Sequence, residues 1–339
     1  MLSYRHGFHA GNHADVLKHL IQVRALRHLL QKDKALLYID THAGAGRYAL
    51  TDSTALKNAE FETGIGRLWA ERGLPAPLAD LVDEVRRFNR ESQEGGRADD
   101  GRLRRYPGSP QLAAQLLRSQ DRIRCFEKHS TEIRILTANL ATLGRRAQAE
   151  AGDGFERLAS LLPPPSRRAL VLIDPSYEDK RDYAHLRESI RAAMSRFPTG
   201  TYIVWYPLVR RREAMLLPGA LRVHGGADWL NVTLTVKAEP ESGFGLFGSG
   251  VFVINPPYTL AAELGEVMPV LVDRLGQDDE AGWMLETGTT TAGQANRFTA
   301  RARPLASARP LASPHRTPAA PGSRPARSPG KPSGTGRRS

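Results

Sequence analysis

At 339 residues, 40% of them hydrophobic, the chain is long enough to bury one large core or two small ones. It has no run of eighteen apolar residues, and its first eleven residues carry His, Arg and Tyr where a signal peptide needs an apolar stretch. We therefore expect no membrane span and a cytoplasmic protein. The single cysteine, Cys125, excludes an intrachain disulfide and lacks the Cys/His neighbours of a metal site, so we expect it to be buried.

The net charge of +12 is concentrated at the C-terminus. Residues 287–339 contain ten basic residues and no acidic one, so the rest of the chain carries only +2. This segment is rich in Pro, Ala, Ser, Gly and Arg and cannot bury a core, so we expect it to be disordered. It is either an electrostatic arm for RNA or a solvated extension. The near absence of aromatic residues, with Phe298 alone, favours the second interpretation.

Before this tail, apolar strand-like runs alternate with helical patterns. Asn12 is the expected N-cap of a helix from His13 to about Lys32, and a short buried strand at 35–40 follows it. Later strands are expected at 123–127, 169–174, 202–206, 230–236 and 251–255, with helices at 131–143 and 182–197. Strands separated by helices predict a mainly parallel sheet covered on both faces.

Residues 52–105 interrupt this alternation. They contain two amphipathic segments, 65–69 and 78–88, followed by the polar, glycine-rich stretch 91–101, and no strand pattern. We predict a small helical subdomain inserted after the first strand. Insertions at this place usually cap the ligand crevice, so the subdomain is a candidate for substrate binding. Residues 1–51 and 106–286 would form the main domain.

The first candidate site is the glycine loop from Asp40 to Gly46. Gly44 and Gly46 let the backbone approach a ligand at the carboxyl end of the first strand, where open α/β sheets bind nucleotides. A dinucleotide site would need a second strand ending in an acid about twenty residues later, and the insertion occupies that place. The next strand ends in Glu127, which suits a ribose diol. The loop therefore fits an adenosyl ligand without a pyrophosphate; the alternative is a tight turn that binds nothing.

Asp153 and Gly154 form part of a second turn, before Phe155, and allow two interpretations. The Asp153 carboxylate either accepts a hydrogen bond from the adenine amine of a cofactor or caps the helix that begins at Phe155. The residues alone favour neither.

The decisive motif is Asp174-Pro175-Ser176-Tyr177, at the end of an apolar strand. The lone pair of an adenine amine is delocalised into the ring, and acceptors for both amine hydrogens would localise it. Asp174 and the Pro175 carbonyl can be those acceptors, and Tyr177 can stack on a base that has left its duplex or loop. The alternative is a strand end with an ordinary Pro-Ser turn, and the glycine loop placed earlier in the chain favours the amine site.

A second tetrapeptide, Asn255-Pro256-Pro257-Tyr258, also follows an apolar strand. By residue type it matches an amine-binding tetrapeptide better than 174–177 does. It ends the last expected strand, however, far in order from the first strand, so it is the second choice.

Four segments together resemble a known family: 1–6, 8–19, 40–48 and 106–110. They are similar to the RlmJ family, bacterial methyltransferases of an adenine in 23S ribosomal RNA, over roughly residues 1–285. The resemblance implies a class I S-adenosylmethionine-dependent methyltransferase fold, Rossmann-like, with a mainly parallel seven-stranded sheet and a small inserted helical subdomain.

The resemblance also implies roles for individual residues. Asp174 matches a position of both cofactor contact and catalysis, and with Pro175 and Tyr177 completes the catalytic set. Tyr4 matches a position linked to the RNA substrate, with Lys18 as a helper. The remaining cofactor-binding positions fall on His19, His42, Ser109, Glu127, Asp153 and Gly154, beside Gly44 and Gly46 of the loop.

Ser176 departs from the family, which has Asp-Pro-Pro-Tyr at this motif. The acceptor carbonyl belongs to Pro175, so the amine-binding set is still complete. Serine frees φ at position 176 and relaxes the restriction on Pro175, so the loss is stiffness, and we expect a working enzyme.

The sequence thus predicts methyl transfer from S-adenosylmethionine to adenine N6 in naked or partly assembled 23S rRNA, by a monomer. His13 and His19 lack a third ligand with suitable spacing, so no metal is expected. Two alternatives stay open: a DNA adenine-N6 methyltransferase, and a non-catalytic protein that binds RNA or the cofactor.

Overall fold

The computed structural model describes residues 6–91, 100–224, 228–241 and 245–288, all within one compact unit that spans Met1–Pro304. Tyr4 and the tail from residue 289 onward, with its predicted disorder, lie outside the described residues. No helix in the described part of the chain is long and apolar enough to span a bilayer.

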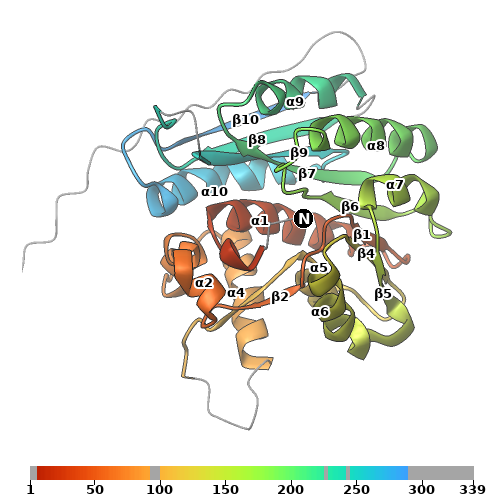
Figure 1. Ribbon diagram of the computed structural model, residues 1–339, viewed down its shortest axis with the longest axis horizontal. Coiled ribbons are helices and arrows are strands. Elements are labelled where there is room, and N and C mark those ends of the chain that lie inside the picture. The colour runs from red at the N-terminus through yellow and green to blue at the C-terminus, as the bar shows by residue number, and fades with distance from the viewer. Residues whose placement is uncertain (1–5, 92–99, 225–227, 242–244, 289–339) are drawn as a thin grey trace, which may run out of the picture. The chain divides into compact units, whose positions relative to one another are not determined.

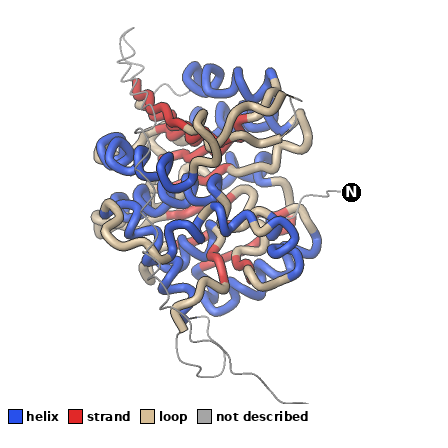
Figure 2. The backbone as a smooth tube through the Cα atoms, turned by 90° about the vertical axis from the view of Figure 1, so that its left-hand side faces the viewer, coloured by secondary structure: helices blue, strands red, loops and turns tan. Residues whose placement is uncertain are grey.

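An eight-stranded sheet runs through the centre of the unit, with helices on both sides (Figures 1 and 2). Its strand order is β10-β8-β9-β7-β6-β1-β4-β5, and the pairings from β7 to β5 are all parallel. The pairings β7–β9, β9–β8 and β8–β10 are antiparallel. The strands are β1 (Leu37–Asp40), β4 (Arg122–Glu127), β5 (Ala147–Ala151), β6 (Ala169–Ile173), β7 (Thr201–Leu208), β8 (Trp229–Thr235), β9 (Gly248–Ile254) and β10 (Gly282–Gly288).

The predicted fold class is confirmed, with one strand more than the seven expected. The additional strand is β10, which pairs along the edge of β8. Neither β10 nor β5, the strand at the other edge, was predicted. A separate two-stranded sheet joins β2 (Arg47–Ala49) to β3 (Arg105–Pro107).

The two faces of the sheet carry separate hydrophobic clusters, as the alternation of side chains along a strand requires. In β6, Leu170 and Leu172 face the cluster that includes α1, while Val171 and Ile173 face the cluster that includes α8. All four are fully buried, because helices cover both faces. Figure 1 shows α8 and α9 on one side of the sheet and α1 and α10 on the other. The longer helices are α1 (His13–Leu29), α4 (Ala76–Glu91), α5 (Ser109–Leu116), α6 (Ser130–Leu140), α8 (Asp182–Arg196), α9 (Arg212–His224) and α10 (Leu260–Leu275).

Helix α1 begins as predicted, because the Asn12 side chain accepts hydrogen bonds from the backbone N–H groups of Ala14 and Asp15, both at 3.0 Å. It ends at Leu29, three residues before the expected Lys32. Thirteen of its seventeen residues are buried, because it packs between the sheet, α4, α5 and α10. Its N-terminal half therefore holds polar side chains inside the protein.

Residues 52–105 form α2 (Ser53–Asn58), α3 (Ile65–Trp69) and α4. They pack against the N-terminal segment: Glu60 accepts hydrogen bonds from His9 and Asn12, and the Ile65 N–H donates to the Gly11 carbonyl. The division of the chain into a main domain and an inserted subdomain stays a prediction.

Candidate active site

Two chain segments lie side by side at one edge of the sheet. β1 and β6 are adjacent and parallel, with Asp40 opposite Leu172, so the loop that follows β1 and the segment 174–177 after β6 leave the same edge. Open α/β sheets bind ligands at this edge.

A cavity of about 540 Å³ opens between these segments. This volume lies in the range of small-molecule sites. Among the residues predicted to hold a cofactor or the target amine, its lining includes Lys18, His19, His42, Gly44, Ser109, Glu127, Asp153, Asp174 and Pro175.

Gly46 and Gly154 do not line this cavity; both make room for neighbouring parts of the chain. A Cβ on Gly154 would lie 2.1 Å from the carbonyl oxygen of Thr41. Gly46 has φ of +76°, and its carbonyl accepts a hydrogen bond from Gly108 at 3.0 Å. Gly44, in contrast, has φ of +57° and lines the cavity.

Glu127 is held at the end of β4 by backbone donors. Its Oε2 accepts from the Gly44 N–H at 2.9 Å, and its Oε1 accepts from the His129 N–H at 2.7 Å. The glycine loop and the acid are thus one structural unit, and the carboxylate has a fixed orientation in the cavity wall.

Asp153 caps the helix α7 (Gly154–Leu158), which confirms one of its two interpretations. Its Oδ1 accepts from the Phe155 N–H at 2.9 Å, and its Oδ2 lies 2.8 Å from the Lys128 ammonium. The carboxylate also lines the cavity, so contact with a cofactor stays a prediction.

His19 presents a buried nitrogen that has no hydrogen-bond partner among the described residues. Its Nδ1 lies 2.8 Å from the Tyr106 hydroxyl, while Nε2 has no partner and is 3.9 Å from Asp15 Oδ1. Burial lowers the pKa of His19 to about 3, so the ring is neutral. We assign the hydroxyl of Tyr106 as donor to Nδ1, which leaves the ring proton on Nε2 for an acceptor on a ligand.

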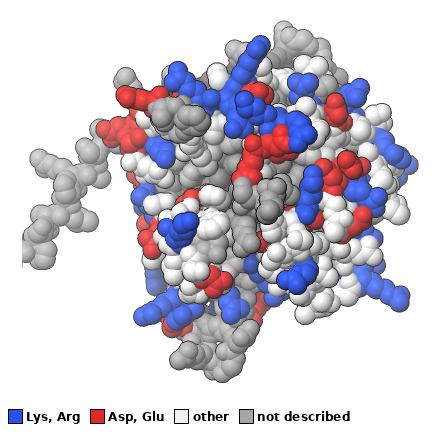
Figure 3. All heavy atoms as spheres, viewed as in Figure 1, with Lys and Arg blue, Asp and Glu red and all other residues white. Residues whose placement is uncertain are grey.

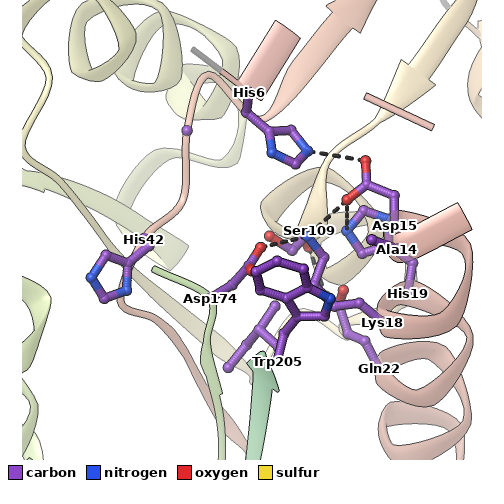
Figure 4. A network of polar contacts seen from close by, with 12 residues as sticks. His6, Ala14, Asp15, Lys18, His19, Gln22, His42, Ser109, Asp174 and Trp205 are labelled. Atoms are coloured by element: carbon purple, nitrogen blue, oxygen red, sulfur yellow. Dashed lines mark hydrogen bonds and ion pairs between the residues drawn. The ribbon is translucent and has the colours of Figure 1, made fainter. Parts of the chain in front are cut away.

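A chain of ionisable groups leads from the N-terminal segment to Asp174 (Figure 4). The Lys18 ammonium lies 2.7 Å from Asp15 Oδ1 and 2.5 Å from Asp174 Oδ2. Asp15 Oδ2 is 3.0 Å from His6 Nε2 and accepts from the Gly11 N–H at 2.8 Å. The side chains of Lys18 and Asp15 are only 4% and 1% exposed, so each charge depends on its partners.

The charge state of Lys18 follows from this arrangement. Burial alone would lower its pKa, but the attractions of Asp15 and Asp174 outweigh burial and raise the pKa above its ordinary value. For Asp15, burial alone would raise the pKa, but His6 and Lys18 lower it well below its ordinary value. Lys18 therefore stays positive over the physiological pH range and keeps a full charge beside Asp174.

A second, smaller cavity of about 210 Å³ meets the first at Asp174. The two linings share His6, Lys18, Asp174 and Ser176. The wall of the smaller cavity includes three aromatic side chains, Tyr177, Tyr183 and Trp205. In both linings, no described residue comes from 52–105.

Tyr177 is held firmly in this wall. Its hydroxyl donates to the Trp205 carbonyl at 2.7 Å, its ring lies 4.6 Å from that of Tyr183, and its carbonyl accepts from Arg211 at 2.8 Å. The side chain is only 3% exposed, so the predicted stacking on a base stays untested.

The sequence did not identify Trp205, Tyr183, Arg211 or Asp15 as parts of the site. Trp205 lies on β7, next to β6, and its indole N–H has no hydrogen-bond partner in the described part of the chain. A tryptophan near the carboxyl end of the neighbouring strand was the available signal.

The second tetrapeptide, 255–258, lies at the opposite edge. β9 runs antiparallel to β7, and Ile254 pairs with Tyr202 near the beginning of β7. The Asn255 amide donates to the carbonyls of Pro198 (2.8 Å) and Gly200 (2.7 Å), which precede that strand. This segment therefore cannot share a cavity with Asp174, and the second choice was wrong.

Buried histidines should make the protein sensitive to acid. Burial lowers the pKa of His13 and His42 to about 4 and that of His19 to about 3, whereas the unfolded chain binds these protons near pH 6.5. Stability therefore falls as the pH falls below 6.5. Two groups oppose this trend: burial raises the pKa of Asp40 to about 6, and the hydrogen bond to Glu60 raises the pKa of His9.

We expect the free energy of unfolding to drop by ~3 kcal/mol between pH 6.5 and pH 5. Urea denaturation across this range would measure it, and the His42→Gln variant should lose about 1.5 kcal/mol less. A stability that is flat or rises toward pH 5 would contradict the neutral state of these rings.

The described residues contain no group of three or more His, Cys, Asp or Glu placed to hold a metal ion. The sequence profile of the family described as "Ribosomal RNA large subunit methyltransferase D, RlmJ" matches residues 33–287. The chain belongs to the RlmJ family. The resemblance inferred from its N-terminal segments and glycine loop is thereby confirmed.

Two relatives in the RlmJ family are named "Ribosomal RNA large subunit methyltransferase J". The Haemophilus influenzae protein is 40% identical over 286 residues, which cover 84% of this chain and 98% of that protein. The Escherichia coli protein is 43% identical over 275 residues, or 81% of this chain and 94% of that protein. A crystal structure of a Legionella pneumophila protein, 35% identical, superposes with a TM-score of 0.74 over 83% of this chain and 99% of that one.

Proposed function

We propose that this protein transfers a methyl group from S-adenosylmethionine to the N6 amine of an adenine in 23S ribosomal RNA. The observation that supports the proposal most strongly is the junction of two cavities at Asp174. A donor in one cavity and a base in the other would meet at this carboxylate. The names of the RlmJ relatives favour RNA over DNA as the substrate.

The larger cavity suits the cofactor. Glu127 would accept hydrogen bonds from the ribose diol, and Asp153 would accept from the adenine amine of the cofactor. The unpartnered Nε2 of His19 would donate to the carboxylate of its amino-acid part. When bound, S-adenosylmethionine supplies an electrophilic methyl group on a sulfonium.

Asp174 and Pro175 orient the target amine. Lys18 occupies Oδ2 of Asp174, so Oδ1 is the oxygen available to accept one amine hydrogen, and the Pro175 carbonyl accepts the other. With both hydrogens held in this way, the nitrogen lone pair is directed at the methyl group. The methyl carbon would come from the cofactor, whose sulfonium would become a neutral thioether, and the surplus proton of the methylated amine would pass to water.

Lys18 orients the carboxylate of Asp174. The Lys18 ammonium lies 2.5 Å from Asp174 Oδ2 and pairs with the carboxylate. The main contribution of Asp174 is therefore an oriented negative charge at the place where positive charge develops on the amine.

The smaller cavity would hold the adenine ring against the wall that Tyr177, Tyr183 and Trp205 form. A base held there must leave its stack in the RNA, and aromatic walls offset the lost stacking. The unpartnered indole N–H of Trp205 can donate to a ring nitrogen of the base. We expect a monomeric enzyme acting in the cytoplasm on naked or partly assembled RNA, with Tyr4 near the substrate.

Mass spectrometry of 23S rRNA fragments from cells that lack this gene tests the proposal. One N6-methyladenine should disappear, return with the wild-type gene and stay absent with Asp174→Ala. An unchanged adenine methylation map would remove the assignment. Preferred methylation of a single-stranded DNA oligonucleotide would favour the DNA alternative, and cofactor binding without transfer to any RNA would favour a non-catalytic protein.

Ser176 lines both cavities, so its replacement by the family proline is informative. Ser176→Pro restricts the backbone at 175 and 176 without changing the acceptor oxygens. We expect kcat on an rRNA fragment equal to that of the wild type or higher, measured by transfer of a tritiated methyl group. A clear fall in kcat would mean that catalysis needs the backbone freedom that serine gives at position 176.

A further inference from the structure

At the edge of the sheet opposite the active site lies a cavity of about 390 Å³, here called the basic hollow. It lies between the C-terminal end of α1 and the beginnings of β6 and β7. Lys18 and His28 are ten residues apart on α1, which places the hollow about 15 Å along the helix from the active site. Its lining consists of His28, Leu29, Lys32, Lys34, Arg167, Arg168, Ala169, Thr199 and Thr201.

Four cations converge on the basic hollow without acidic partners. Lys32, Lys34, Arg167 and Arg168 have no carboxylate within 4.0 Å in the described part of the chain. On α1 itself the pattern is opposite, since Arg24 and Arg27 each pair with acids of neighbouring helices.

Arg168 binds only neutral acceptors. Its guanidinium donates to the carbonyls of Leu29, the last residue of α1, and of Lys34 in the segment that follows, which leaves its charge uncompensated. Burial and then the charge of the neighbouring Arg118 lower the pKa of Arg168. The charge of Asp121 raises the pKa of Arg168, but Asp121 is already paired with Arg118. The hollow therefore has a local excess of positive charge, which suits an anion.

An exposed aromatic ring stands beside the basic hollow. Tyr258 is 85% exposed, and its ring packs edge-on against His28 with centroids 5.2 Å apart. Asn255 anchors this turn through its two bonds to the carbonyls of Pro198 and Gly200, and the Thr201 hydroxyl donates to the Asn255 carbonyl at 3.1 Å. The ring is therefore a supported platform at the protein surface.

We propose that the basic hollow and Tyr258 form a second RNA-binding site, distant from the target adenine. Lys32, Lys34 and Arg167 contact phosphates of the RNA backbone, and an unpaired base stacks on Tyr258. This inference rests on the proposed function, because the polyanion concerned is the rRNA substrate. Among the described residues on the face in Figure 3, basic and acidic side chains are interspersed.

The decisive test compares a long and a short RNA. The triple variant Lys32→Glu/Lys34→Glu/Arg167→Glu should raise KM about tenfold for a long 23S fragment and leave kcat unchanged. On a short stem-loop that carries the target adenine and cannot reach the opposite edge, its KM should equal that of the wild type. The slope of log affinity against log salt for the long fragment should become shallower by about one for each lost contact.

A matched triple variant controls for net charge. Arg134, Arg187 and Arg191 are exposed residues of α6 and α8 with no acidic partner in the described residues, and their change to Glu alters the charge equally. This control should leave KM for the long fragment within about twofold of the wild type.

Tyr258→Ala should raise KM for the long fragment. Tyr258→Phe should have the KM of the wild type, because stacking needs only the ring.

Three outcomes would overturn the site. The first is an unchanged KM of the triple variant on the long fragment. The second is an equal rise on both RNAs, and the third is an equal rise in the control, which would reduce the effect to overall charge. Competition by inorganic phosphate alone, with no preference for the long RNA, would likewise leave only a free-anion site. Failure of the proposed function gives a different result, since the wild type would then methylate neither RNA.

Discussion

Replacing Asp174 by alanine should lower kcat by a factor of about 10³, the size found when one oriented polar group is removed from a reacting centre. The amine would lose one of its two acceptors and the negative charge beside it. Single-turnover transfer of a tritiated methyl group to an rRNA fragment measures this step directly. Equilibrium binding of the RNA should change far less than kcat.

The asparagine variant makes the prediction sharper. In Asp174→Asn, the Lys18 ammonium would attract the amide oxygen, so the amide NH₂ group would face the target amine as a donor. We therefore expect Asp174→Asn to be nearly as inactive as Asp174→Ala. Adding Lys18→Met should free the amide to turn and recover part of the activity.

Asp153 provides the matched control. It lines the same cavity, but of the two reactants it would contact the cofactor and not the target amine. Asp153→Asn should therefore raise KM for S-adenosylmethionine and leave kcat within a fewfold of the wild type. Wild-type kcat in Asp174→Asn would contradict the assigned role of the carboxylate.

Periodicity in the sequence predicted the elements that are buried on both faces, because their apolar runs are long and uninterrupted. β6 was expected at 169–174 and is found at Ala169–Ile173. The edge strands β5 and β10 lack such apolar runs and were therefore not predicted. β5 reads Ala-Gln-Ala-Glu-Ala, which has low strand propensity, and it becomes a strand through its pairing with β4.

Residues at strand ends were predictable because parallel strands bring their carboxyl ends to one edge. The ionic chain was not, because Lys18 and Asp174 are 156 residues apart and no local pattern links them. Glycines were ambiguous for another reason. A Cβ on Gly44 would clash with the Tyr48 hydroxyl, and a Cβ on Gly154 would clash with the backbone of Thr41. Both glycines therefore make room for the chain itself, yet only Gly44 lines the cavity, and the residue type is the same at both positions.

The Lys18→Met variant should show how strongly the site depends on this ionic chain. It leaves Asp15, 1% exposed, without the Lys18 ammonium and with His6 as its remaining close partner, and breaking a buried pair in this way costs about 3–5 kcal/mol of stability. Because the free carboxylate can be relieved by protonation, the loss should be larger at pH 8 than at pH 5. Chemical denaturation at both pH values measures it.

The double variant Asp15→Asn/Lys18→Met separates stability from catalysis. Removing both charges should bring the free energy of unfolding back to within about 1 kcal/mol of the wild type, since neither buried group is then an unpaired ion. Asp174 would still lack the ammonium that fixes its orientation, so kcat should stay low. Recovery of kcat together with stability would mean that Lys18 serves only the fold, and a fully stable single variant would mean that Asp15 does not need it.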